Sequence, residues 1–191
     1  MIMTEHESKR LRLAATGLVT LAYLADLLWQ HLHGGVITHH LLQRADMPAI
    51  SNWWGLLSLP VLTWFLIGRI QRRIAVQRSR GASTRLPIRV IAGFAAALLL
   101  GALLAVSFTY NVASMTEYVF DVILLLAVLL PVYRAECVLG FVLAMSITFG
   151  GVLPTLVATV LAAGSAVIHL LLRPLVVRLW TLSKGTTSPS R

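Results

Sequence analysis

The stretch NWWGLLSLPVLTWFLIGRIQRR, residues 52–73, combines three features of a membrane-crossing helix. The run from Trp53 to Ile70 is apolar and has about the length that a bilayer requires. Two tryptophans stand at its amino end, and this side chain prefers the membrane interface. Arginines stand at its carboxyl end, and Lys and Arg accumulate on the cytoplasmic side of membrane proteins. The stretch therefore predicts a span that enters at the outer surface and ends in the cytoplasm.

The composition of the whole chain indicates that this span is one of several. Of its 191 residues, 58% are hydrophobic and 12% are charged, and the mean hydropathy is +0.82. A soluble domain carries about twice that charged fraction. These values predict an integral membrane protein, and six spans of about 20 residues would use most of the chain.

The apolar stretches predict an all-α, polytopic transmembrane helical bundle. The expected spans are residues 11–30, 53–70, 88–108, 115–133, 138–149 and 153–172. The sequence FGGVLPT, residues 149–155, divides the last two, because Gly-Gly and Pro punctuate helices. One kinked helix or a re-entrant pair is the alternative for residues 138–172.

The basic residues predict the orientation of the bundle. The net charge is +9, and with six spans every Lys and Arg except Arg44 falls on one side. The positive-inside rule then places both termini in the cytoplasm, as expected for a bacterial cytoplasmic (inner) membrane. The chain divides into a cytoplasmic segment (residues 1–10), the transmembrane domain (residues 11–172) and a basic cytoplasmic tail (residues 173–191).

The charge also bears on partners. The basic loop over residues 69–89 is expected to touch the anionic lipids of the bilayer. Nucleic-acid binding is not expected, because no basic folded module exists to carry it. The single cysteine, Cys137, excludes an intramolecular disulfide and a thiolate zinc knuckle.

The connection between the first two spans contains four of the six histidines. His31 and His33 are two positions apart, and His39 and His40 are adjacent, so each pair diverges on a helix and the spacing is not a zinc signature. Thr38 can cap a short interfacial helix, HHLLQRA, over residues 39–45.

The first span also carries polar residues at helical spacing. Tyr23, Asp26, Gln30 and His33 share one face. An ionisable residue within a span is costly against lipid, so we expect Asp26 to face the bundle interior or water. Ser51 or Asn52 is placed to cap the second span.

Two carboxylates in the fourth span are the expected counterpart of this face. Glu117 and Asp121 are four residues apart on the outer half of the span, where like charges repel unless one is protonated or both meet a cation. One interpretation is a hydrated rim pair. The other is an extracytoplasmic polar cluster, whose candidate members are Asp26, Gln30, His31, His33, His39, His40, Asp46, Glu117 and Asp121.

A divalent metal is the cofactor that such a cluster would suit, because it combines carboxylates and imidazoles. The candidate ligands are His31, His33, Glu117 and Asp121. Near the cytoplasmic side, Tyr133–Glu136 indicates a capping and salt-bridge turn, and His169 is interpreted as a packed or snorkelling residue.

Three functions remain open. The chain lacks a P-loop and the GxSxG, HExxH and CxxC motifs. The first hypothesis is a membrane protein that binds or passes an ion or small solute, with a homo-oligomer supplying the pathway that the apolar inner half lacks. The second is a membrane-embedded metal-dependent enzyme that acts on a lipid-like substrate at the outer surface. The third is a non-catalytic accessory protein.

Overall fold

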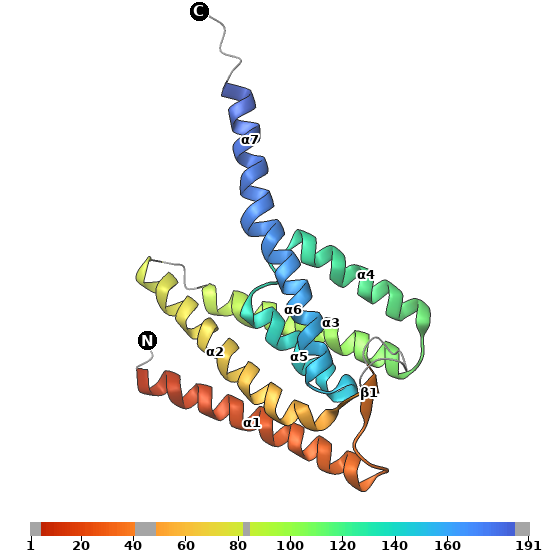
Figure 1. Ribbon diagram of the computed structural model, residues 1–191. Helices are drawn as coiled ribbons and strands as arrows, with labels where there is room; N and C mark the ends of the chain where they lie inside the picture. Colours follow the sequence, from red (N-terminus) through yellow and green to blue (C-terminus); the bar gives the residue numbers. More distant parts are fainter. Residues whose placement is uncertain (1–4, 41–48, 82–84, 186–191) are drawn as a thin grey trace, which may run out of the picture.

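The chain folds into a bundle of helices (Figure 1). The structure is a computed structural model that describes residues 5–40, 49–81 and 85–185. Each predicted span corresponds to a helix, which confirms the all-α class. The helices are α1 (Glu5–Leu32), α2 (Gly55–Ser79), α3 (Leu86–Thr109), α4 (Ala113–Leu129), α5 (Ala135–Phe149) and α6 (Val152–Val167).

Within the described ranges, four helical segments are long and apolar enough to cross a membrane. They are Glu5–Leu32, Asn52–Ser79, Leu86–Thr109 and Val152–Arg178. The last is α6 continued through a π-helical turn, η3 (Ile168–Leu172), into α7 (Arg173–Gly185). The helices α4 and α5 have only 17 and 15 residues, or about 26 and 23 Å, against about 30 Å of hydrocarbon.

The helices α5 and α6 are separate and lie side by side, so residues 138–172 do not form one kinked helix. The break falls at Gly150, whose φ of 71° lies in the left-handed region that glycine adopts without strain. Pro154 lies in the first turn of α6, where its missing N–H costs no helical hydrogen bond.

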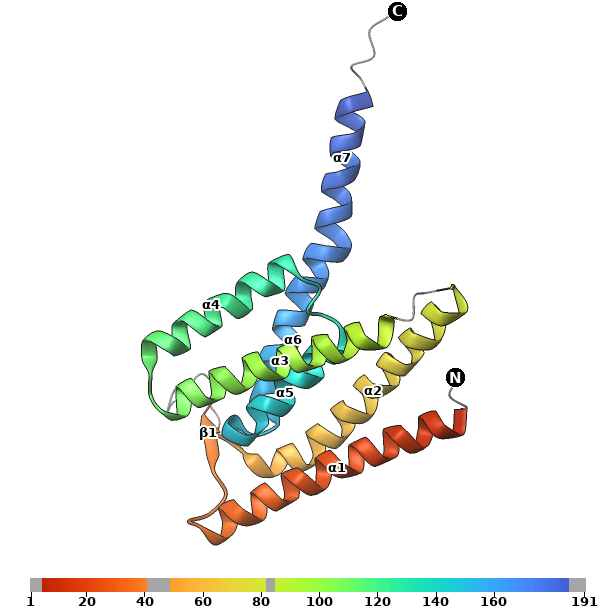
Figure 2. The same ribbon diagram turned by 180° about the vertical axis from the view of Figure 1, so that it is seen from behind.

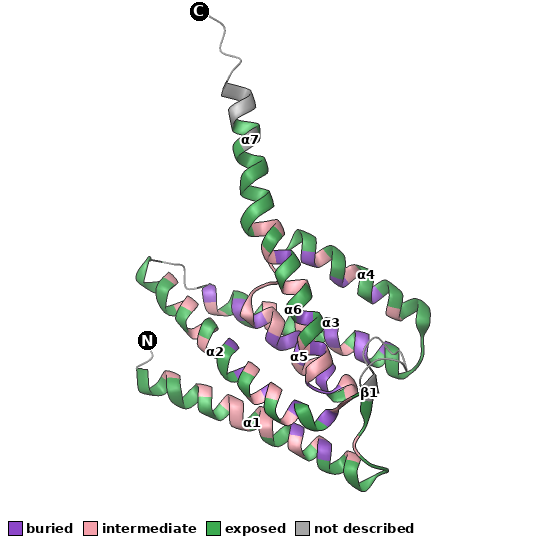
Figure 3. Ribbon diagram, viewed as in Figure 1, coloured by how far each residue is buried: buried purple, intermediate pink, exposed green. Residues whose placement is uncertain are grey.

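The short helix α5 is the centre of the bundle, packed by α2, α3 and α6 (Figure 3). Its closest neighbour is α3, because small residues let the two backbones approach. A Cβ at Gly140 would collide with the carbonyl oxygen of Phe94, and one at Gly101 would lie 3.0 Å from that of Phe141. Small residues are the usual means by which apolar helices associate in lipid.

The connection between α1 and α2 is a hairpin. The interfacial helix predicted over residues 39–45 is therefore wrong at residues 39 and 40, which belong to a strand. Strand β1 (Thr38–His40) pairs antiparallel with β2 (Ala49–Ser51), with Thr38 opposite Ser51. Tertiary hydrogen bonds hold this segment extended, since the Ile37 carbonyl accepts from the backbone N–H of Asn52 at 3.1 Å. Residues 41–45 of the predicted helix lie outside the described residues.

A short 3-10 helix, η2 (Asn52–Trp54), leads from the hairpin into α2. The hydroxyl of Ser51 accepts a hydrogen bond from the Trp53 backbone N–H at 3.4 Å, so Ser51 caps η2. The helix α2 itself begins after Trp54 without a side-chain cap, so the predicted cap lies one short helix earlier.

The two ends of the bundle differ in charge. The start of α1, the α2–α3 turn and the α4–α5 turn lie together, and the hairpin and the α3–α4 turn lie at the opposite end (Figures 1 and 2). The first group carries the arginines of α1, α2, α3 and the α4–α5 turn. We call it the basic end. Arg44 lies outside the described residues.

Candidate functional site

The predicted polar face of α1 forms a hydrogen-bonded network. The Gln30 side-chain N–H donates to Asp26 Oδ2 at 2.7 Å. The Gln30 Oε1 accepts from the Asn52 side chain at 3.2 Å and from the Ile37 backbone N–H at 3.3 Å. Asp26 is half-buried and belongs to this network through its bond with Gln30.

The same network joins three parts of the chain. The Tyr23 hydroxyl donates to the carbonyl of Asn52, a residue that is 3% exposed. Added side chains would not fit around it, because a Cβ at Gly55 would collide with Tyr23 and one at Gly150 with Asn52. These contacts hold α1, the start of α2 and the α5–α6 turn together, so the network acts as a structural joint.

Neither His31 nor His33, the two histidines of the connection whose side chains the structure describes, forms an ion pair or hydrogen bond with a carboxylate. The His33 ring stacks on Trp29 with 3.8 Å between ring centroids, and its Nδ1 lies 2.9 Å from the Trp29 carbonyl oxygen. His31 is exposed. The side chains of His39 and His40 lie outside the described residues, as does Asp46.

The carboxylates of α4 point away from the bundle. Glu117 and Asp121 are exposed, and they occupy the face of α4 opposite Val119, Ile123 and Ala127, which are buried. In addition, α1 packs mainly on α2, whereas α4 packs on α3 and α6 at the other side of the bundle (Figures 1 and 2).

The candidate metal ligands are therefore not gathered. Among the residues that the structure describes, no three His, Cys, Asp or Glu side chains are grouped to hold a metal ion. Consequently His31, His33, Glu117 and Asp121 do not form such a set.

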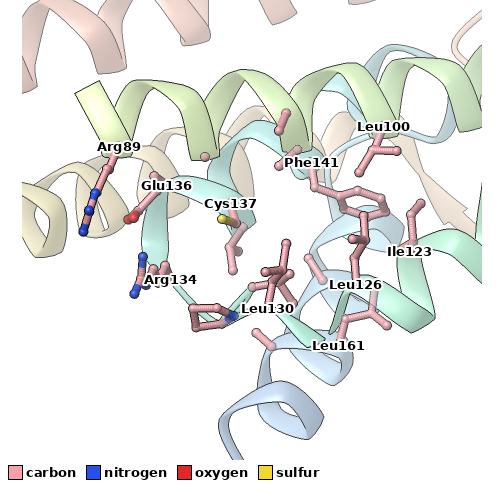
Figure 4. Close-up of a pocket in the computed structure, with 18 residues that line it drawn as sticks. Arg89, Leu100, Ile123, Leu126, Leu130, Arg134, Glu136, Cys137, Phe141 and Leu161 are labelled. Carbon is pink, nitrogen blue, oxygen red and sulfur yellow. The ribbon is translucent and has the colours of Figure 1, made fainter. Parts of the chain in front are cut away.

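A different site lies at the basic end, where a cavity of about 250 Å³ opens between α3, α4, α5 and α6 (Figure 4). Small residues of α3 and α6 line part of the cavity. These are Gly93, Ala96 and Ala97 on α3, and Ala158 and Ala162 on α6. Leucines, Ile123 and Phe141 complete a lining that is almost entirely apolar.

Charged side chains gather at one end of this pocket. Figure 4 shows Arg89, Arg134 and Glu136 together, with the large apolar side chains at the other end. Glu136 is 2% exposed, and its Oε1 accepts from Arg73 Nη1 at 2.6 Å. Its second oxygen, Oε2, is buried and has no hydrogen-bond partner among the described residues.

The charges at this end leave a positive surplus. Arg73 compensates Glu136, and within the described ranges Arg89 and Arg134 make no ion pair or side-chain hydrogen bond of their own. The capping and salt-bridge turn predicted for residues 133–136 is therefore wrong in its partners. Glu136 pairs with Arg73 of α2 rather than with Arg134, and Arg134 makes no side-chain capping hydrogen bond at the start of α5. The sequence signal for this site was an arginine early in the third span and a carboxylate at the start of the fifth.

The floor of the pocket near the α4–α5 turn is fixed by α6 and η3. The Ser165 hydroxyl donates to the Leu130 carbonyl at 3.1 Å. The ring nitrogens of His169 lie 2.9 Å from the Ser165 carbonyl oxygen and 3.4 Å from that of Leu129. Since Pro131 has no N–H, α4 cannot continue its own hydrogen bonding there, and these groups cap it from outside. His169 is packed, as predicted.

The chain was compared with protein-family models, with curated proteins and with solved structures, and no significant match was found in any of the three.

Proposed function

We propose that the protein is a multi-pass membrane protein, with its basic end in the cytoplasm, that binds an anionic amphiphile in the pocket between α3, α4, α5 and α6. The observation that carries this proposal is the pairing of an apolar cavity with two uncompensated arginines at one end. A bacterial inner membrane is the setting that the charge distribution favours.

The apolar part of the pocket suits an acyl chain. Its volume of about 250 Å³ is close to the lower limit of small-molecule sites, which is about 300 Å³. The lining supplies dispersion contacts and no competing polar group along most of its length. A single chain fits this room better than the two chains of an ordinary phospholipid.

The polar end of the pocket suits an anionic head group. Guanidinium groups bind phosphate and carboxylate through paired hydrogen bonds. Basic pockets between spans on the cytoplasmic side of a membrane are a known setting for anionic lipid head groups. Arg89 and Arg134 occupy that setting if the positive-inside rule holds for this chain.

The outer region supports the other hypotheses less well. Asp26, Gln30 and Asn52 bond to one another, so they offer few free groups to a passing ion or solute. Glu117 and Asp121 face away from the bundle and from α1. A metal-dependent reaction at the outer surface would need ligands that the described residues do not bring together.

Binding can be tested with the purified protein in phosphatidylcholine nanodiscs. Dodecyl phosphate should bind saturably with one molecule per chain, and dodecylphosphocholine should bind much more weakly. Ala162→Leu should lower the affinity for dodecyl phosphate about tenfold, because the larger side chain fills the pocket. Ala163→Leu is the matched control, since Ala163 is exposed on the same helix and does not line the pocket.

The arginines are tested separately. Arg89→Gln combined with Arg134→Gln should remove the preference for the phosphate over the phosphocholine head group, while the chain still binds. Absence of saturable binding by the wild-type protein, or equal affinities of the Ala162→Leu and Ala163→Leu variants, would contradict the proposed function.

A further inference from the structure

The polar end of the pocket contains a buried oxygen, Oε2 of Glu136, that is not hydrogen-bonded to the nearby arginines. Buried polar atoms are nearly always hydrogen-bonded, and an unpaired one carries its full desolvation cost. Oε2 has no such partner in the part of the chain that the structure describes, although Oε1 of the same carboxylate is bonded to Arg73. A buried acceptor without a partner therefore belongs to a residue that lines the polar end of the pocket.

The surroundings of this acceptor are formed by the start of α5 and by α3. Glu136 lies in the first turn of α5, where the helix dipole stabilises a negative charge. Gly93 of α3 leaves space beside it, because a Cβ there would lie only 3.3 Å from the Glu136 Cγ. Arg89 and Arg134 line the same end but are not bonded to Oε2 (Figure 4).

The charge of this region decides which donor fits. An ammonium group would meet the arginine side chains that gather here, whereas a hydroxyl group carries no charge and can donate to a carboxylate strongly. The same ligand must also present an anion to Arg89 and Arg134.

We propose that the pocket selects a single-chain amphiphile whose head group carries both a phosphate and a hydroxyl group, as a 1-acylglycerol phosphate does. The hydroxyl donates to Oε2 of Glu136, and the phosphate binds Arg89 and Arg134. This inference rests on the proposed function and names the ligand class of the same site.

The decisive comparison uses two probes that differ only in the hydroxyl group. They are 1-lauroylglycerol 3-phosphate and its 2-deoxy analogue, each titrated into the wild-type protein in phosphatidylcholine nanodiscs. The hydroxylated probe should bind about tenfold more tightly. Equal affinities would overturn the inference, because a water molecule would then satisfy Oε2 as well as the ligand does.

Variants assign the preference to Glu136. The double variant Arg73→Met, Glu136→Met replaces the ion pair by apolar side chains, an exchange that proteins often tolerate. It should bind both probes equally, whereas Cys137→Ala, which changes a neighbouring lining residue, should keep the tenfold ratio. A ratio that persists in the double variant would overturn the inference.

The experiments distinguish a failure of the proposed function, which is amphiphile binding, from a failure of the proposed selectivity for a hydroxyl group. If neither probe binds saturably, or if Ala162→Leu leaves both affinities unchanged, the proposed function fails. If both probes bind equally and Ala162→Leu weakens both, the function stands and the selectivity is wrong. If the double variant does not fold, the wild-type comparison alone still decides the selectivity.

Discussion

Glu136 illustrates how a single buried charge organises the basic end. Its carboxylate is taken out of solvent by α3 and α5, and the free energy that this costs is offset by Arg73 and by the amino end of α5. The Arg73 side chain is 26% exposed, so it connects the buried carboxylate to the surface of the bundle. The buried carboxylate of Glu136 therefore needs its partner more than the partly exposed Arg73 does.

This inequality predicts the effect of removing the arginine. Arg73→Met should lower the free energy of unfolding by about 3 kcal/mol, because it leaves an uncompensated buried carboxylate. Adding Glu136→Gln to this variant should restore most of the loss, since the neutral amide needs no counter-charge. Reversible unfolding in mixed detergent micelles measures both values. A single variant as stable as the wild-type protein would show that the ion pair contributes nothing.

At the scale of residues, the sequence predicts interactions between side chains that are close along the chain and misses those between side chains far apart along it. The Asp26–Gln30 bond follows from a spacing of four residues on a helix. Arg73 and Glu136 are 63 residues apart, so no spacing rule connects them, and only the packing of α2 against α5 does. The hydropathy pattern likewise gives no sign that small residues of α3 and α6 would leave a cavity.

At the scale of helices, α5 has the weakest sequence signal for a membrane span, yet it is surrounded by other helices. Residues 138–149 are short for a bilayer, yet α5 lies between α2, α3 and α6. Hydropathy measures how apolar a segment is and not which neighbours it meets. The close approach of α5 to α3 depends on Gly140, whose missing side chain leaves room for the backbone at Phe94 and Leu98.

Substitution at Gly140 tests this packing. Gly140→Ala should destabilise the protein by about 2 kcal/mol or more, because the new methyl group meets rigid α3 backbone. Gly164→Ala is the matched control: it lies in α6 with nothing within 4 Å of the added Cβ, and alanine favours helix over glycine. Thermal unfolding in one detergent should separate the two variants. Equal unfolding temperatures would contradict the tight α3–α5 contact.

The hairpin between α1 and α2 shows that the local sequence pattern can predict the wrong secondary structure. The sequence predicts a helix from residue 39 because Thr38 is a good cap and the following residues are apolar on one side. In the structure, Gln30 and Asn52 bind the backbone of Ile37, and Ser51 pairs with Thr38. These partners come from α1, β2 and η2, so the local propensity of residues 39–45 does not include them.

At the scale of the whole molecule, the positions of the charged residues and the lengths of the helices limit how the bundle can lie in a membrane. The described arginines lie at the basic end or along α7. On the outward face of α4, Glu117 lies near the opposite end of the bundle and Asp121 lies at the middle of the helix. Carboxylates in that position avoid hydrocarbon only if they lie at interface depth. If α4 and α5 cross the membrane as proposed, their short lengths require local thinning of the bilayer.

Cysteine labelling tests the six-span topology. In a Cys137→Ala background produced in a bacterial inner membrane, Ser114→Cys reports the start of α4, Ser79→Cys the end of α2, and Thr181→Cys the helix α7; all three positions are exposed. If the basic end faces the cytoplasm, as we propose, a membrane-impermeant maleimide added to spheroplasts should label only Ser114→Cys. The other two should react after disruption.

Each alternative gives a different labelling pattern. If Thr181→Cys reacts in intact spheroplasts while Ser79→Cys does not, the number of crossings after α2 is odd and α4 or α5 does not span the bilayer. If Ser79→Cys reacts and Ser114→Cys does not, the orientation is reversed, and Arg89 and Arg134 face the outside. The binding pocket would then draw its ligand from the outer leaflet, because its charged end moves with the arginines.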